Sequence, residues 1–168
     1  ADSHGHVKGF PGNPNVDIPR KYAGKLDVGA AVGNGLLTVS YDLGLKEPYS
    51  GQVELQTGEV AEDLAYYFTV SEQLPSAVGL GVMVDTDSSV KHAGGFIVQL
   101  LPDAPEEVIE LLEKKLANIE PVTSMMEKGM TPEDMLSYIF EGTDIEFTEK
   151  RDVEFYCDCS KDKISRAL

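Results

Sequence analysis

The chain has 168 residues, 42% of them hydrophobic, and a formal net charge of −15, which suits a globular protein with a modest core. A polyanion repels nucleic acid and anionic lipid, so we exclude both as partners. No apolar run approaches the ~20 residues of a membrane-spanning helix, and residues 1–6 do not resemble a signal peptide, so we expect a cytoplasmic protein.

The first part of the chain predicts short strands, turns and little helix. A strand is expected at residues 6–10, a loop rich in Pro, Gly and Asn at 11–24, and a short helix at 26–32. Apolar and polar residues then alternate at 37–43 and again at 52–56, which predicts two half-buried strands.

The apolar period changes at residues 59–72. Val60, Leu64 and Phe68 recur there every four residues and predict a helix. Two further strands are expected at 78–84 and 96–101, the second in a central position because it is apolar on nearly both faces. Gly79 and Gly81 share one face of the first strand and should let another element pack closely. The fold class predicted for this part is α+β, mainly an antiparallel sheet with helix packing.

The last third of the chain is strongly acidic. Residues 103–154 hold 15 acidic and 5 basic residues, a net charge of −10. Three helices are predicted there, with starts at a capping box at Asp103, at Pro121 and at Thr131. The charge asymmetry suggests a segment with a separate role, and a plain solvated helical surface is the alternative. Short strands are expected at 145–147 and 153–156, and Ser160 is a candidate cap for a last helix.

Four of the five methionines lie between Met125 and Met135. Methionine is flexible and polarizable, and it is typical of surfaces that accept many partners. A small helical core explains the same residues, so both interpretations stay open.

Cys157 and Cys159 are the strongest chemical signal. A disulfide between them would close a very small, strained ring. Two thiolates one residue apart can bind one soft cation, but a structural zinc site needs four ligands. The site is therefore completed elsewhere, or these are ordinary thiols. Acidic neighbours disfavour a catalytic thiolate. His4 and His6 could bind a metal, but solvent-facing strand residues are the favoured interpretation.

Several motifs in order along the chain resemble one family. They are SGQVEL at 50–55, TGE at 57–59, DLAYYF at 63–68, SEQ at 71–73, PS at 75–76, VG at 78–79, GGF at 94–96, EP at 120–121 and DVEF at 152–155 running into CDCS at 157–160. This series is similar to the bacterial redox-regulated heat-shock chaperones of thirty-three kilodaltons.

The resemblance implies three parts: a chaperone core at 1–101 that lacks the family's opening strands and helices, an acidic helical linker at 102–151, and the start of a zinc domain at 152–168. In the family, four cysteines bind zinc as a C-x-C pair and a later C-x-x-C pair. Cys157 and Cys159 match the first pair as metal ligands and redox switch, and the second pair has no counterpart in this chain. Zinc is therefore expected in the full-length reduced protein rather than in this chain alone.

The implied function is that of a holdase, not an enzyme. Oxidation forms disulfides, releases zinc, unfolds the zinc domain and loosens the linker, which then holds unfolding client proteins without ATP during oxidative stress. A homodimer of the oxidised form is also expected. The candidate client-binding residues are apolar positions of the linker: Val108, Leu112, Leu116, Met125, Met126, Met135 and Ile139. The alternatives are a thiol-disulfide oxidoreductase and a plain zinc-binding interaction module.

Overall fold

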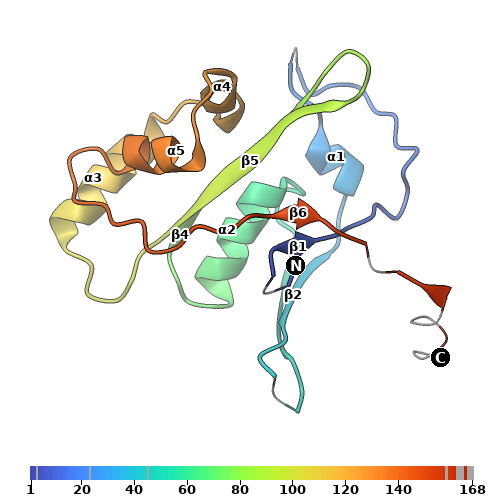
Figure 1. Ribbon diagram of the computed structural model, residues 1–168, viewed down its shortest axis with the longest axis horizontal. Helices are drawn as coiled ribbons and strands as arrows, with labels where there is room; N and C mark the ends of the chain where they lie inside the picture. The colour runs from blue at the N-terminus through green and yellow to red at the C-terminus, as the bar shows by residue number, and fades with distance from the viewer. Residues whose placement is uncertain (3, 23, 45, 158, 162–164, 166–168) are drawn as a thin grey trace. The chain divides into compact units, whose positions relative to one another are not determined.

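The computed structural model describes residues 1–168 except 3, 23, 45, 158, 162–164 and 166–168 (Figure 1). It divides into two compact units, one formed by Ile18–Ile145 and one by Ala1–Asp17 with Glu146–Leu168. The helix expected after Ser160 lies largely outside the described residues. Among the described residues, every helix is too short or too polar to cross a lipid bilayer.

The larger unit begins with a helix and a hairpin. Helix α1 (Val28–Val32) is capped by Asp27, whose side chain accepts a hydrogen bond from the Ala30 N–H at 3.1 Å. Strands β2 (Leu36–Tyr41) and β3 (Tyr49–Glu54) form an antiparallel pair. The two predicted strands are therefore confirmed, although each begins and ends earlier than expected.

Helix α2 (Val60–Val70) confirms the change of period, and a buried carboxylate sets where it begins. Asp63 is 2% exposed, and its Oδ1 accepts the N–H groups of Gln56 at 2.7 Å and Thr57 at 3.2 Å. These bonds tie the turn that precedes α2 to its first turn. Tyr67, one helical turn further on, is fully buried.

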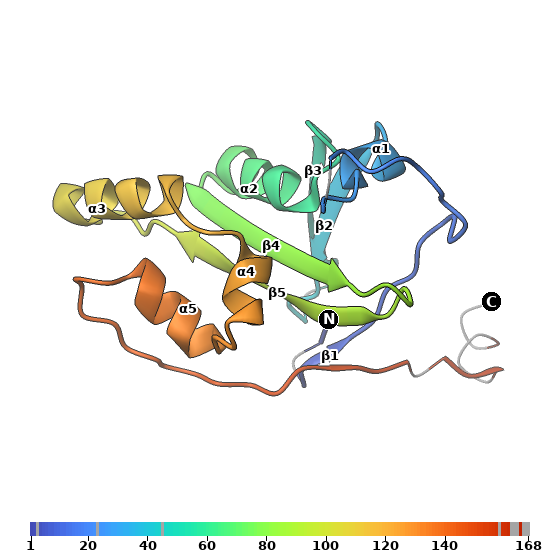
Figure 2. The same ribbon diagram turned by 90° about the horizontal axis from the view of Figure 1, so that it is seen from above.

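Strands β4 (Ser76–Val84) and β5 (Val90–Gln99) form the longest antiparallel pair. Helix α2 lies on one side of this pair, and α4 (Val122–Glu127) and α5 (Pro132–Ile139) lie on the other (Figure 2). In the described part of the chain β5 pairs with β4 alone, so among these residues it does not take the predicted central position. The apolar side chain of Ile97 is accordingly 49% exposed on β5.

The three helices predicted in the acidic segment are present, and only the predicted cap at Asp103 is wrong. Helix α3 (Glu106–Ala117) begins after Pro105 with no side-chain cap, and Asp103 has a φ of +66° instead of closing a capping box. A capping box does open α5, where Thr131 and Asp134 bond each other's backbone N–H groups.

The smaller unit contains one short strand pair. Strand β1 (His6–Val7) lies parallel to β6 (Glu154–Phe155), so residues far apart in sequence pair directly. The strand expected at 145–147 is absent, and that at 153–156 is present in shortened form. The helices and antiparallel pairs confirm the α+β class, with this pair as a parallel addition.

Candidate functional site

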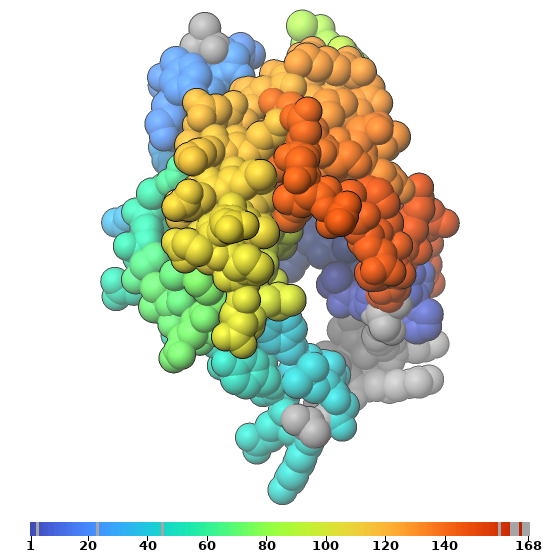
Figure 3. All heavy atoms as spheres, turned by 90° about the vertical axis from the view of Figure 1, so that its left-hand side faces the viewer, coloured from blue at the N-terminus to red at the C-terminus, as the bar shows by residue number. Residues whose placement is uncertain are grey.

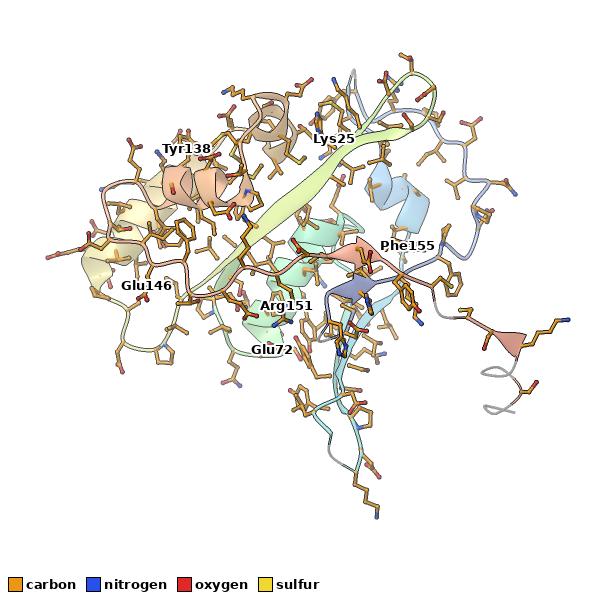
Figure 4. The ribbon with its side chains drawn as sticks, in the orientation of Figure 1. Lys25, Glu72, Tyr138, Glu146, Arg151 and Phe155 are labelled. Carbon is orange, nitrogen blue, oxygen red and sulfur yellow. The ribbon has the colours of Figure 1, made fainter. Side chains whose placement is uncertain are left out.

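The two cysteines lie directly after β6, whose residue Phe155 is labelled in Figure 4. Both cysteine side chains are exposed. The strand before them is held by two backbone hydrogen bonds. The Glu154 N–H donates to the Gly5 carbonyl at 3.1 Å, and the Tyr156 N–H donates to the Val7 carbonyl at 3.0 Å. The chain is therefore held in a fixed, extended path up to the residue before Cys157.

The described residues fit half of a zinc site. No group of three or more His, Cys, Asp or Glu side chains among them could hold a metal ion. Cys157 and Cys159 offer two thiolates, which are ligands of the right chemistry for a soft cation, and a tetrahedral structural site takes four. Their assignment as metal ligands and as redox switch stays a prediction.

His6 is not the solvent-facing strand residue that the sequence suggested. Its ring is 33% exposed, its Nδ1 lies 3.0 Å from Asp2 Oδ2, and its centroid lies 4.6 Å from that of Tyr156. His4 does face solvent, with a side chain that is 77% exposed. Desolvation raises the pKa of the Asp2 carboxyl, but hydrogen bonds from His6 and His4 outweigh it and leave this pKa below its ordinary value.

The candidate client-binding residues of α3 and α5 lie in the apolar layer against β5. Leu112 and Ile139 are buried and pack with Val98, and Val108 and Leu116 adjoin them. Helices α3 and α5 lie side by side in the space-filling view (Figure 3). Because Leu112 and Ile139 are buried against the sheet, they can meet another protein only after the helices leave it.

The methionines form the second half of this layer. Met125 and Met135 are buried with Val122, and Met126 adjoins them. Met125 has no exposed surface at all. In this folded state the methionines therefore act as a core, which is the alternative that the sequence left open. A role in client binding stays a prediction.

Helix α4 approaches the sheet closely at one glycine, as the small residues of β4 predicted. A Cβ atom at Gly81 would lie 3.0 Å from the backbone nitrogen of Thr123 and 3.0 Å from the Val122 Cβ. Such contacts are tighter than side chains normally make, so only glycine lets α4 lie this near to β4.

Ion pairs link neighbouring parts of the acidic segment. Lys115 of α3 lies 2.7 Å from Glu141, which follows α5, and 4.1 Å from the centroid of the Tyr138 ring. The hydrogen bond from Lys115 holds the pKa of the Glu141 carboxyl below its usual value. Lys128 bonds Glu120 at 2.6 Å and so bridges the two ends of α4. The few cations of this segment thus lie next to carboxylates whose repulsion they reduce.

The polar contact between Tyr41 and Glu72 was missed by the sequence reasoning. The Tyr41 hydroxyl of β2 donates to Oε1 of Glu72 at 2.9 Å. Glu72 lies just after α2 and is labelled in Figure 4. Desolvation, with a contribution from Glu72, raises the pKa of Tyr41 to about 12. The two residues are 31 positions apart, and no spacing rule links a strand tyrosine to a helix end at that distance. The sequence singled out Glu72 only as part of the motif at residues 71–73, and it gave Tyr41 no role beyond its strand.

A family model described as Hsp33 protein matches residues 1–168. The 33 kDa chaperonin of Agathobacter rectalis is 60% identical over 168 residues, which cover the whole chain and 58% of that protein. The 33 kDa chaperonin of Clostridium botulinum is 56% identical over 165 residues, or 98% of this chain and 56% of that protein.

A solved structure shows the same fold. The crystal structure of the 33 kDa chaperonin (heat shock protein 33 homolog) from Thermotoga maritima matches with a TM-score of 0.88 and 44% identity, over 98% of this chain and 56% of that one. The chain thus spans a little over half the length of the relatives it matches. A match over every residue, with high identity and a shared fold, shows that the chain belongs to the Hsp33 protein family.

Proposed function

We propose that the full-length protein containing this chain is a redox-regulated, ATP-independent holdase chaperone of the cytoplasm. Its partners are unfolding proteins under oxidative stress, and its oxidised form is a homodimer. Residues 1–101 form part of the core, 102–151 the linker and 152–168 the start of the zinc domain. The chaperonin names of the relatives support the general function.

The observation that carries the proposal is the way in which α3, α4 and α5 are held. Their apolar side chains are buried on β4 and β5, while the segment of residues 103–154 has a net charge of −10. Apolar burial therefore works against charge repulsion, and the balance can be shifted by whatever anchors the end of the segment. That end runs through β6 into Cys157.

The anchor in this proposal is a zinc site made by Cys157, Cys159 and two thiolates from outside this chain. Bound zinc would cross-link the small domain, and such sites contribute ~10–16 kcal/mol to folding. Oxidation of two thiolates to one disulfide passes two electrons to an oxidant such as hydrogen peroxide and removes both ligands. The linker then loses its anchorage and exposes the residues that line β4 and β5.

The experiment measures zinc content and client holding by the full-length protein before and after peroxide. We expect one zinc per reduced chain, loss of zinc on oxidation, and suppression of the aggregation of a thermally unfolding client only afterwards. Replacing Cys157 with serine should abolish stoichiometric zinc binding.

These measurements, together with an assay of disulfide reduction, separate the alternatives. A plain zinc-binding module would lose zinc without gaining client holding, and a thiol-disulfide oxidoreductase would reduce a disulfide substrate catalytically. Either result, or full zinc occupancy in the serine variant, would contradict the proposal.

A further inference from the structure

Strand β1 makes a specific contact with the segment that leads into the cysteine pair. His6 is paired with Glu154 and Val7 with Phe155, and the two backbone hydrogen bonds described above flank these pairs. The pairing brings the N-terminal residues of the chain beside the segment that carries the candidate switch (Figure 1). A strand of two residues is too short to be stable without such a partner.

The backbone at Gly5 is shaped for this contact. Its φ is +84°, a conformation that residues with a side chain rarely adopt. A Cβ atom there would lie 2.1 Å from the carbonyl oxygen of Asp152, which is far inside van der Waals contact. The neighbouring atom is backbone rather than the end of a flexible side chain, so the two segments would have to separate.

The side chain of His6 adds contacts on the same edge. One ring nitrogen lies 3.0 Å from the Asp2 carboxylate and the other 3.6 Å from that of Glu154. The ring also packs against Tyr156, the residue before Cys157. Asp2 accepts the backbone N–H groups of His4 and His6, which holds the turn leading into β1. The contact therefore has both a backbone and a side-chain part.

We infer that β1 is a positioning element for the cysteine pair: it holds the strand before Cys157 in place and so slows oxidation of Cys157 and Cys159. The consequence for oxidation rests on the proposed function, whereas the strand pairing can be tested without it. Gly5 and His6 act through β6 and do not touch the reacting sulfur atoms in this inference.

The test compares three glycine-to-alanine substitutions, and later His6→Ala, in the full-length protein. Gly5→Ala places a Cβ atom against Asp152 and a side chain at a positive φ. Gly24→Ala places a side chain at a similar φ, +85°, with no atom near the new Cβ. Gly9→Ala causes neither the clash nor the strain. The first readout is hydrogen exchange of the Glu154 and Tyr156 amides. We expect roughly ten-fold or greater acceleration in Gly5→Ala alone, because both amides lose their acceptors.

The second readout is the rate at which Cys157 and Cys159 are oxidised by peroxide, followed by mass spectrometry, with thermal stability as a control for folding. We expect faster oxidation in Gly5→Ala and a smaller acceleration in His6→Ala, which keeps the backbone bonds. If Gly5→Ala does not fold, the oxidation rate of His6→Ala provides the test. Three results would overturn the inference: unchanged exchange at both amides in Gly5→Ala, unchanged oxidation in both Gly5→Ala and His6→Ala, or equal acceleration in Gly9→Ala. Faster oxidation in a protein that holds no client would leave the inference standing and refute the proposed function.

Discussion

Truncating Met125 to alanine should weaken the packing of α4 on the sheet in the reduced full-length protein. The side chain has no exposed surface and packs with Val122 and Met135. The change removes about three methylene-sized groups at ~0.8 kcal/mol each, and buried truncations of this kind cost ~2–5 kcal/mol. Flexible neighbours, Met126 and Met130 among them, can partly refill the space. We therefore expect a loss of about 2–3 kcal/mol, in the lower part of that range.

Hydrogen exchange is the suitable assay, because a protein of several units does not unfold in one step. The Met130 N–H donates to the Met125 carbonyl at 3.2 Å and reports on the end of α4. A loss of about 2–3 kcal/mol corresponds to roughly 30- to 150-fold faster exchange through local opening. Leu101→Ala is the control, since that side chain is 72% exposed and should change little. Equal exchange in the two variants would refute the reasoning that buried methionine holds α4 on the sheet.

Three smaller perturbations test other parts of the larger unit. Thr131→Ala removes the capping box of α5 and should cost about 1 kcal/mol in urea unfolding, while Ser137→Ala on the exposed side of α5 should cost much less. Hydrogen bonds from Thr131 lower the pKa of Asp134, so its contribution is present above the ordinary carboxyl pKa and is lost as the pH falls through the lowered value. Thermal melts from pH 7 to 3 should therefore show a shallower acid loss in Asp134→Asn, and an unchanged slope would contradict this. Tyr41→Phe should remove the phenol that titrates near pH 12 in an absorbance titration. Because the pKa of Tyr41 is raised, the contribution of this hydroxyl to stability is complete below pH 10 and is lost as the pH rises toward 12.

Periodicity was a reliable guide to the helices and a weaker one to their ends. The apolar spacing located α2 and the three helices of the acidic segment, because one buried face repeats every three to four residues. The start of α3 was wrong because Asp103 matches a capping sequence but has a left-handed φ. A capping box depends on backbone geometry that the residue types alone do not determine.

Long-range contacts were beyond reach for a different reason. The pairing of His6 with Glu154 joins two-residue strands that are too short to show a period. The buried carboxylate of Asp63 looked like an ordinary acidic residue in the first turn of a helix. The strand pairing and the hydrogen bonds of Asp63 both depend on which backbone N–H groups the fold places nearby. The residue types alone do not determine those positions. For the cysteine pair, by contrast, the spacing alone was enough to predict a metal or redox role, and that role stays a prediction.

The lengths of α3, α4 and α5 bear on how a switch in this segment would work. They contain 12, 6 and 8 residues, and isolated helices shorter than about 12–15 residues are marginal in water. Their order therefore comes from packing on β4 and β5 rather than from their own hydrogen bonds. A helix that leaves the sheet loses the packing that stabilises it, so undocking and unfolding of the helix occur together. Local opening of this segment would then present disordered apolar chain to a client, not an intact helical face.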